Sequence, residues 1–168
     1  MTRRGAWYGV VLWREEADGS LAVCSEYQAP RRSTNPYGSA RNRDAWELQL
    51  ELPKGGTELV TPRESSGLLD SNPWQTARWE LWEEAGVWLQ WRDGSSGSGW
   101  YLKDGSSVPA PRFGLDKAWL LTRLRDDDVV VPCESRRWLS LAAGEEGLLR
   151  RDHCNLVRRL LPCPRGGV

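Results

Sequence analysis

The chain has 168 residues, a length that favours a single domain with a sizeable buried core. Hydrophobic residues make up 39% and charged residues 27%, which is typical of a globular protein and argues against general disorder. The 23 basic and 23 acidic residues cancel, so nucleic-acid binding through bulk charge is not expected. No apolar run approaches the roughly 18 residues of a membrane span, and no targeting segment is recognisable. We therefore expect a cytoplasmic protein that does not bind membranes.

Strand patterns dominate the first third of the chain. Residues 6–13 and 21–27 are apolar-rich runs joined by a turn, and we expect both to be strands. The following segment 28–44 carries four arginines against one acid and is predicted to be a long basic loop. Residues 46–52 alternate apolar and polar side chains, the period of a half-buried strand. We expect the Pro-Lys-Gly-Gly run at 53–56 to end this strand.

A helix is predicted over residues 74–85, after an extended loop at 57–72. Pro73 suits the first position of a helix, and Gly86 is a natural C-terminal cap. Three residues just before the helix are good N-caps: Asp70, Ser71 and Asn72.

Strand patterns return after this helix. Residues 87–91 are predicted to be a strand, and 92–112 is predicted to be a flexible insertion because it contains a Ser/Gly-rich stretch. A further strand is expected at 117–124, followed by an acidic turn at 126–128. A second helix, expected to begin at about Ser140, carries five apolar residues that would pack on the sheet: Leu148, Leu149, Val157, Leu160 and Leu161. This order of elements predicts the α/β class and a sandwich of helices and sheet.

Cysteine and histidine usage narrows the possible chemistry. The four cysteines show no CxxC spacing, so neither a zinc ribbon nor a thioredoxin-type site is indicated, and we expect reduced thiols. His153 is the only histidine, so any Ser-His-Asp or Cys-His mechanism would depend on it. We expect His153 to be a surface or packing residue. If the protein is an enzyme, carboxylates are the expected chemical groups.

The helix over 74–85 carries the carboxylates of greatest interest. Glu80 and Glu84 are four residues apart and lie on one face, and Glu83 is three residues from Glu80. Like charges so placed repel by a few tenths of a kcal/mol, and a divalent cation would offset that repulsion. Mg²⁺ prefers oxygen ligands and is usually held by a few carboxylates together with water and substrate phosphates. The alternative for these residues is a solvated acidic face.

Two segments together resemble the Nudix box, namely residues 53–58 (PKGGTE) and 77–87 (ARWELWEEAGV). Gly55 matches the first glycine of the box, and residues 80–87 match its last eight positions without a gap. The resemblance implies one Nudix domain over residues 1–168, folded as an α/β/α sandwich with a mixed β-sheet. It also implies hydrolysis of a nucleoside diphosphate linked to another moiety, or of a related pyrophosphate.

The sequence departs from the box in three places. The loop between Gly55 and the helix is ten residues longer than in the family. Trp79 replaces the box arginine, and Arg78 lies one position away and points elsewhere on the helix. The first box glutamate has no direct match, since counting back from the helix gives Ser71, and Glu64 or Asp70 could take its place. When a glutamate and its partner arginine are lost together, neither charge is left without a partner. An active enzyme is therefore favoured over a degenerate one.

The resemblance also implies roles for individual residues. Glu80, Glu83 and Glu84, with the carbonyl near Gly55, would hold Mg²⁺ or Mn²⁺, and Glu83 or Glu84 could act as the base. Substrate binding is expected from residues beside the double glycine and from the basic loop, where arginines can hold phosphates by paired hydrogen bonds. The alternative for the basic loop is a solvated surface loop. The expected substrate-binding residues are Lys54, Gly56, Glu58, Arg31, Arg32, Arg41 and Arg43.

Several substrates and one non-enzymatic function remain open. The approach to the box and the segment 134–140 resemble the branch of the family that acts on diadenosine and diphosphoinositol polyphosphates. An RNA 5′ end is a second possible substrate, since exposed tryptophans could stack a base. A catalytically weak Nudix-fold subunit that binds RNA or protein is the third hypothesis. The sequence does not decide between a monomer and a homodimer.

Overall fold

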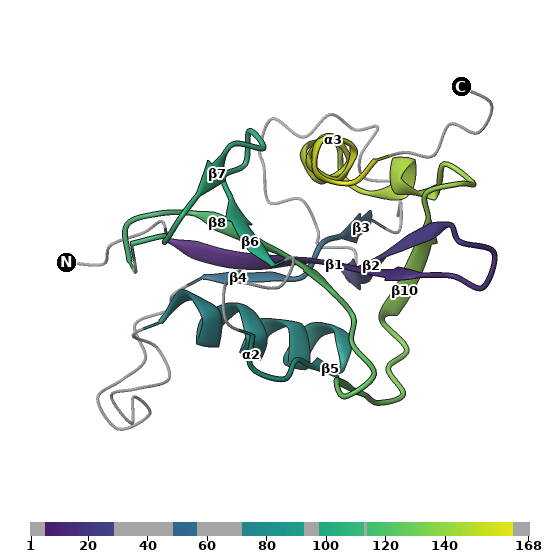
Figure 1. Ribbon diagram of the computed structural model, residues 1–168, viewed down its shortest axis with the longest axis horizontal. Coiled ribbons are helices and arrows are strands. Elements are labelled where there is room, and N and C mark those ends of the chain that lie inside the picture. The colour runs from purple at the N-terminus through teal and green to yellow at the C-terminus, as the bar shows by residue number, and fades with distance from the viewer. Residues whose placement is uncertain (1–5, 29–48, 57–71, 93–97, 113, 163–168) are drawn as a thin grey trace, which may run out of the picture.

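The structure is a computed structural model that describes residues 6–28, 49–56, 72–92, 98–112 and 114–162. A mixed β-sheet forms its middle layer, with helix α2 (Pro73–Ala85) on one face and helix α3 (Arg151–Leu160) on the other (Figure 1). The predicted α/β/α sandwich is confirmed.

Strand β1 (Trp7–Glu15) lies at the centre of this sheet. It pairs antiparallel with β2 (Leu21–Gln28) and parallel with β8 (Ala118–Arg123), which makes the sheet mixed. The order along the main path of the sheet is β10-β2-β1-β8-β6-β7. The remaining strands of that path are β10 (Arg136–Ser140), β6 (Gly99–Tyr101) and β7 (Ser107–Val108).

The preceding strand ends before Pro53, as predicted, but the double-glycine segment is itself a further strand. Strand β3 (Gln49–Glu51) pairs with β2, and β4 (Lys54–Gly56) pairs with the beginning of β1. The chain therefore changes partner at Pro53, whose carbonyl accepts a hydrogen bond from Val10 N. Residues 46–48, also predicted to be strand, lie outside the described residues.

The segment 92–112 also differs from the prediction in its described part. The segment predicted to be a flexible insertion contributes two strands to the sheet. Strand β6 pairs with β8, and β7 pairs with β6 in a hairpin. The predicted strand at 87–91 is reduced to β5 (Val87–Trp88), which pairs with β9 (Val129–Val130) in a small separate sheet.

Helix α2 begins and ends as its sequence predicts. The side-chain oxygen of Asn72 accepts a hydrogen bond from Trp74 N at 2.9 Å, and Pro73 occupies the first turn, where its missing N–H costs nothing. Gly86 ends the helix with φ 67°, a left-handed conformation that favours glycine, and its N–H reaches Trp82 O. These two ends fix which residues of the helix face the sheet.

The second helix begins about ten residues later than predicted. Strand β10 continues through Ser140, and a 3₁₀ turn at Glu145–Leu148 precedes α3. The extension is stabilised by the sheet, since Leu141 N donates to Leu21 O, and by the Glu145 carboxylate, which accepts from Ser140 N. Local apolar spacing could not reveal these long-range hydrogen bonds.

Two apolar layers hold the helices on the sheet. Between the sheet and α2 lie Tyr8, Val10, Leu12 and Cys24 together with Leu81 of the helix. Between the sheet and α3 lie Val11, Val23, Leu52, Trp119 and Val157, among others. None of the described helices is long and apolar enough to cross a membrane.

Candidate active site

Glu80 of α2 lies directly against the backbone of Gly55 in β4. The sheet register pairs Gly55 with Tyr8, whose side chain belongs to the α2 side of the core, so Gly55 also faces α2. A Cβ atom on Gly55 would fall 1.8 Å from Cδ of Glu80, a distance that no real side chain tolerates. Glycine at this position therefore provides the space that the Glu80 carboxylate occupies.

Glu84 is fixed one turn further along the same face. Lys54 N donates to Oε2 of Glu84 at 3.1 Å, so β4 touches both glutamates of the helix. Burial, and after it the neighbouring Glu26 carboxyl, which is hydrogen-bonded to Glu84, raise the pKa of Glu84 to about 9. Without a cation beside it, the Glu84 carboxyl therefore holds a proton at neutral pH.

Sequence reasoning missed Glu26, which lies inside β2. Positions 22, 24 and 26 of this strand face α2, and Glu26 is only 3% exposed. Register pairs Glu26 with Glu51 of β3, whose carboxylate forms an ion pair with Arg150 (3.3 Å between Nη1 and Oε1). An acid on the buried face of an apolar strand was the available signal, because such residues are rarely buried without a function or a partner.

The side chain of Lys54 is not beside these carboxylates. Its ammonium lies 5.0 Å from the ring centroid of Trp7, and both residues are on the α3 face of the sheet. Lys54 thus contributes its backbone N–H to the site, and its role in substrate binding stays a prediction. Gly56 is exposed, with open space around the position of a Cβ atom.

The remaining predicted residues are placed apart or lie outside the described ranges. Glu83 is exposed on α2 and, among described residues, makes no hydrogen bond or ion pair. The predicted positions outside the described residues are Arg31, Arg32, Arg41, Arg43, Glu58, Glu64, Asp70 and Ser71.

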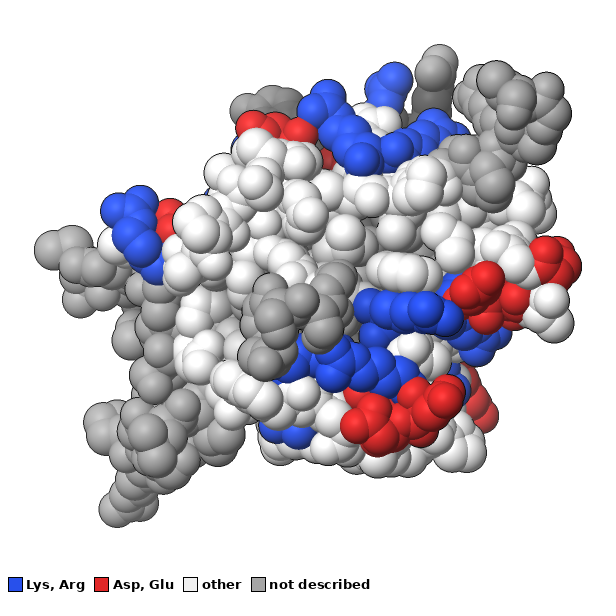
Figure 2. Space-filling model, in the orientation of Figure 1, with Lys and Arg blue, Asp and Glu red and all other residues white. Residues whose placement is uncertain are grey.

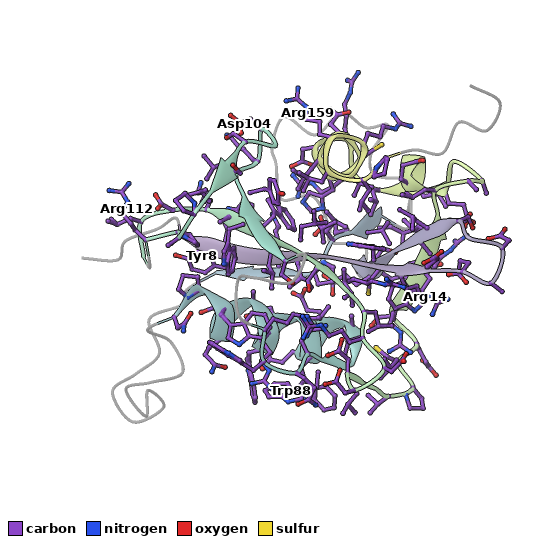
Figure 3. The ribbon with its side chains drawn as sticks, in the orientation of Figure 1. Tyr8, Arg14, Trp88, Asp104, Arg112 and Arg159 are labelled. Atoms are coloured by element: carbon purple, nitrogen blue, oxygen red, sulfur yellow. The ribbon has the colours of Figure 1, made fainter. Side chains whose placement is uncertain are left out.

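Trp79 and Arg78 face away from the carboxylates. Trp79 is 48% exposed and packs edge-to-face on Trp88, at the outer side of α2 where Figure 3 labels Trp88. Arg78 stacks on the same ring at 3.8 Å and donates to Leu89 O at 2.6 Å. Arg78 therefore does not take the place of the missing box arginine.

His153 is a packing residue, and it is buried rather than on the surface. Its Nδ1 accepts a hydrogen bond from Leu52 N at 3.0 Å, and its ring packs edge-to-face on Trp119. Burial lowers the pKa of His153 to about 3, so the ring is neutral at physiological pH. The hydrogen bond ties α3 to the segment between β3 and β4 and thereby supports the strand that carries Gly55.

The donor set fits a hard divalent cation. Glu80 and Glu84 offer carboxylate oxygens beside the Gly55 backbone, and a site built from oxygen atoms suits Mg²⁺ or Mn²⁺. Within the described ranges, no three His, Cys, Asp or Glu side chains are arranged to hold a metal ion between them. This is compatible with Mg²⁺, which is usually bound by one or two carboxylates together with substrate phosphates.

No protein-family model and no curated protein matches the sequence. Among solved structures, the Nudix hydrolase RenU of M. smegmatis is similar at TM-score 0.53 and 16% identity, covering 95% of this chain and 85% of that one. The Ap4A hydrolase of C. elegans is similar at TM-score 0.51 and 18% identity, covering 92% and 93%.

A third similar structure contains a bound nucleotide. It is the Nudix domain of Shewanella oneidensis NrtR in complex with ADP-ribose, at TM-score 0.53 and 13% identity, covering 95% of this chain and 87% of that one. Sequence identities this low carry no residue roles across, but the three likenesses extend over nearly the whole chain. The chain has the fold of the Nudix hydrolases.

Proposed function

We propose that this protein is a metal-dependent hydrolase of a pyrophosphate bond in a nucleoside diphosphate-linked or polyphosphorylated substrate. One observation carries the proposal: Glu80 and Glu84 lie on one face of α2 against β4, where Gly55 leaves room for one carboxylate and Lys54 N–H anchors the other. The fold shared with Nudix hydrolases supports it.

The chain's own residues divide the work in this proposal. Glu80, Glu84 and the Gly55 carbonyl would hold Mg²⁺ or Mn²⁺, which supplies charge neutralisation for the pyrophosphate and a more acidic water. Glu84 is held in place by Lys54 N–H, so its second carboxylate oxygen keeps a fixed direction. Glu83 is exposed beside these two residues and is available to accept a proton from the attacking water.

For the substrate, we favour diadenosine or diphosphoinositol polyphosphates over an RNA 5′ end. The basic loop at 28–44 suits a polyanion, and the zero net charge gives little general affinity for a long nucleic acid. A solved structure of similar fold is described as an Ap4A hydrolase, which supports testing this class first. The cytoplasmic location stays a prediction.

A binding protein of the same fold is the second candidate function. The observation that favours it is Trp79, which stands in place of the box arginine and is exposed beside Trp88. Such a protein would bind a nucleotide, RNA or protein without turning it over.

Phosphate release from a panel of pyrophosphates with Mg²⁺ and Mn²⁺ tests the proposal, with Glu84→Gln as the inactive variant. Gln75 on the same helix is half-buried and uncharged, and it provides a control, because Gln75→Ala leaves both carboxylates in place. Metal-dependent turnover that is lost only in Glu84→Gln supports a hydrolase. Tight ligand binding without turnover by the folded protein supports the binding function instead.

A further inference from the structure

We infer that the outer side of α2 and β5 is a docking surface for a basic protein segment, whose arginine or lysine side chains would stack on tryptophan rings. The surface consists of Trp79 and Trp82 of α2, Trp88 of β5 and Val129 of β9, and is called the tryptophan face below. It lies apart from the carboxylate site, and the inference does not depend on the proposed hydrolysis.

The tryptophan face combines several exposed apolar side chains at one place. Trp79 is 48% exposed and Val129 is 44% exposed. Trp79 and Trp82 each pack edge-to-face on Trp88, which Figure 3 labels on the side of α2 away from the sheet. Val129 is the register partner of Trp88 and stands beside it. Single exposed apolar residues are ordinary, but neighbouring ones that form a patch are typical of an interaction site.

The aromatic rings of this surface are suited to binding cations. Tryptophan attracts a guanidinium or ammonium group over its ring more strongly than the other aromatic residues do. Such a contact already exists here, because the guanidinium carbon of Arg78 lies 3.8 Å from the ring centroid of Trp88. Arg78 is held in place by its hydrogen bond to Leu89 O. Within the described part of the chain, no cation is stacked on the exposed ring of Trp79.

Exposed acidic side chains border the tryptophan face. Glu83 is exposed one helical turn from Trp79, so the two side chains are neighbours on the helix surface. Asp126 and Asp127 are exposed in the turn that leads to Val129. Three carboxylates therefore lie around the rings, and they favour a partner with positive charge.

The arginines close to this surface are less accessible than these carboxylates. Arg92 is buried and forms an ion pair with Asp128, and Arg78 is half-buried against Trp88. Arg125 is also half-buried. Of these charged side chains, only the acidic ones bordering the face are fully exposed, so phosphate groups would be repelled. A basic protein segment therefore fits the surface better than an RNA strand, although bases could stack on the same rings.

The test is fluorescence anisotropy of labelled probes titrated with the full chain at low ionic strength. The probes are a short peptide of alternating arginine and glycine, a peptide of equal length with glutamate in place of arginine, and an oligouridylate. We expect the arginine peptide to bind at least about tenfold more tightly than either of the other probes.

A first pair of variants tests the exposed ring. Trp79→Ala removes it, and the control Leu148→Ala removes an apolar side chain that is equally exposed, at 49%, in the 3₁₀ turn before α3. We expect Trp79→Ala to weaken binding of the arginine peptide at least about fivefold, and Leu148→Ala to weaken it less than about twofold.

A second pair of variants tests the acidic border and leaves the rings in place. The double variant Asp126→Asn with Asp127→Asn removes two bordering charges. Its control, Asp18→Asn with Asp104→Asn, removes two exposed charges from turns elsewhere, one between β1 and β2 and one beside α3. We expect the first pair to weaken binding of the arginine peptide about threefold and the control to have less effect, with the difference shrinking as salt is added.

Binding of the arginine peptide that is unchanged in a folded Trp79→Ala protein would overturn the inference. So would equal losses in Trp79→Ala and Leu148→Ala, or no binding of the arginine peptide by the wild type. Tighter binding of the oligouridylate, lost in Trp79→Ala, would overturn it by identifying the surface as a nucleic-acid site. Pyrophosphate hydrolysis by the same variants stays a separate readout, because Glu80 and Glu84 are unchanged in all of them.

Discussion

Adding one methyl group at Gly55 should disable the site while leaving the fold in place. In Gly55→Ala, the new Cβ would overlap Cδ, Cγ and Oε1 of Glu80 at 1.8, 2.2 and 2.2 Å. Carbon atoms of this kind essentially never approach below 3.0 Å, so the Glu80 carboxylate must move by more than 1 Å. Misplacement of a reacting group by about 1 Å can reduce turnover about 100-fold.

The cost in stability should be small by comparison. All three overlapping atoms belong to one flexible side chain, so Glu80 can swing aside without displacing backbone. We expect the free energy of unfolding to fall by about 1 kcal/mol, at the low end of the range for overpacking. Part of that loss is offset because alanine restricts the unfolded chain.

The matched control is Gly56→Ala, since the nearest atom to a Cβ at Gly56 is the carbonyl oxygen of Ala6 at 4.0 Å. Metal-dependent hydrolysis and urea unfolding of both variants would be measured beside the wild type. We expect Gly55→Ala to lose far more turnover than Gly56→Ala, whose new methyl group displaces no carboxylate. Equal activity in the two variants would refute the role assigned to the contact between Gly55 and Glu80.

Three further predictions concern stability. The pKa of Glu84 is raised in the fold, so the folded state keeps a proton that the unfolded state releases. Metal-free protein should therefore lose stability as pH rises from about 4.5 to 9. In urea titrations above pH 7, Glu84→Gln should be more stable than the wild type by about 1–3 kcal/mol. His153 has the opposite sign, since its lowered pKa means that stability is lost as pH falls from 6.5 towards 3, and His153→Asn should flatten this part of the pH profile in thermal unfolding. Asp128 forms a buried ion pair with Arg92, so Asp128→Ala should lower the free energy of unfolding by about 3–5 kcal/mol in chemical denaturation. The control Asp126→Ala, at an exposed position, should lower it by less than about 0.5 kcal/mol. Similar losses in both variants would contradict the buried pair.

The main features of the fold could be predicted because their signals are local. Asn72, Pro73 and Gly86 define the ends of α2 through short-range hydrogen bonds and backbone preferences. The apolar runs that became β1, β2 and β8 are long enough to be unambiguous. The spacing of Glu80 and Glu84 fixes their common face on any helix, so this half of the site follows from the sequence.

The errors arose where distant segments decide the structure. Residues 54–56 form a strand because β1 offers a free edge there, and residues 136–140 stay extended because β2 pairs with them. Neither partner is visible in local periodicity. The side chain of Lys54 faces α3 because strand register, rather than closeness to Gly55 in the sequence, sets its direction.

Buried charge was also difficult to predict. Glu26 is one acid in an apolar strand, and only the packing of α2 over β2 brings it to Glu84. Asp128 was expected in an acidic turn, yet both of its carboxylate oxygens are used, by Arg92 and by the backbone N–H groups of Gln90 and Arg125. Such residues become recognisable only when their partners, more than thirty positions away in most cases, are known.

One edge of the molecular surface is basic. Figure 2 shows basic side chains gathered along the edge of the molecule where α3 lies. Arg150 belongs to this helix end and reaches the Glu51 carboxylate, which connects the basic edge to the acidic site.

The central claim is that Glu80 and Glu84 form the metal-dependent hydrolytic site, and phosphate release tests it most directly. The wild type, Glu84→Gln and Gln75→Ala would be assayed with Mg²⁺ and Mn²⁺ on diadenosine polyphosphates, a diphosphoinositol polyphosphate, nucleoside diphosphate sugars and capped RNA. The account predicts metal-dependent release from a polyphosphorylated compound by the wild type and Gln75→Ala, with a loss of at least about 100-fold in Glu84→Gln. Unchanged turnover in Glu84→Gln, or no turnover of any compound by the folded wild type, would contradict it.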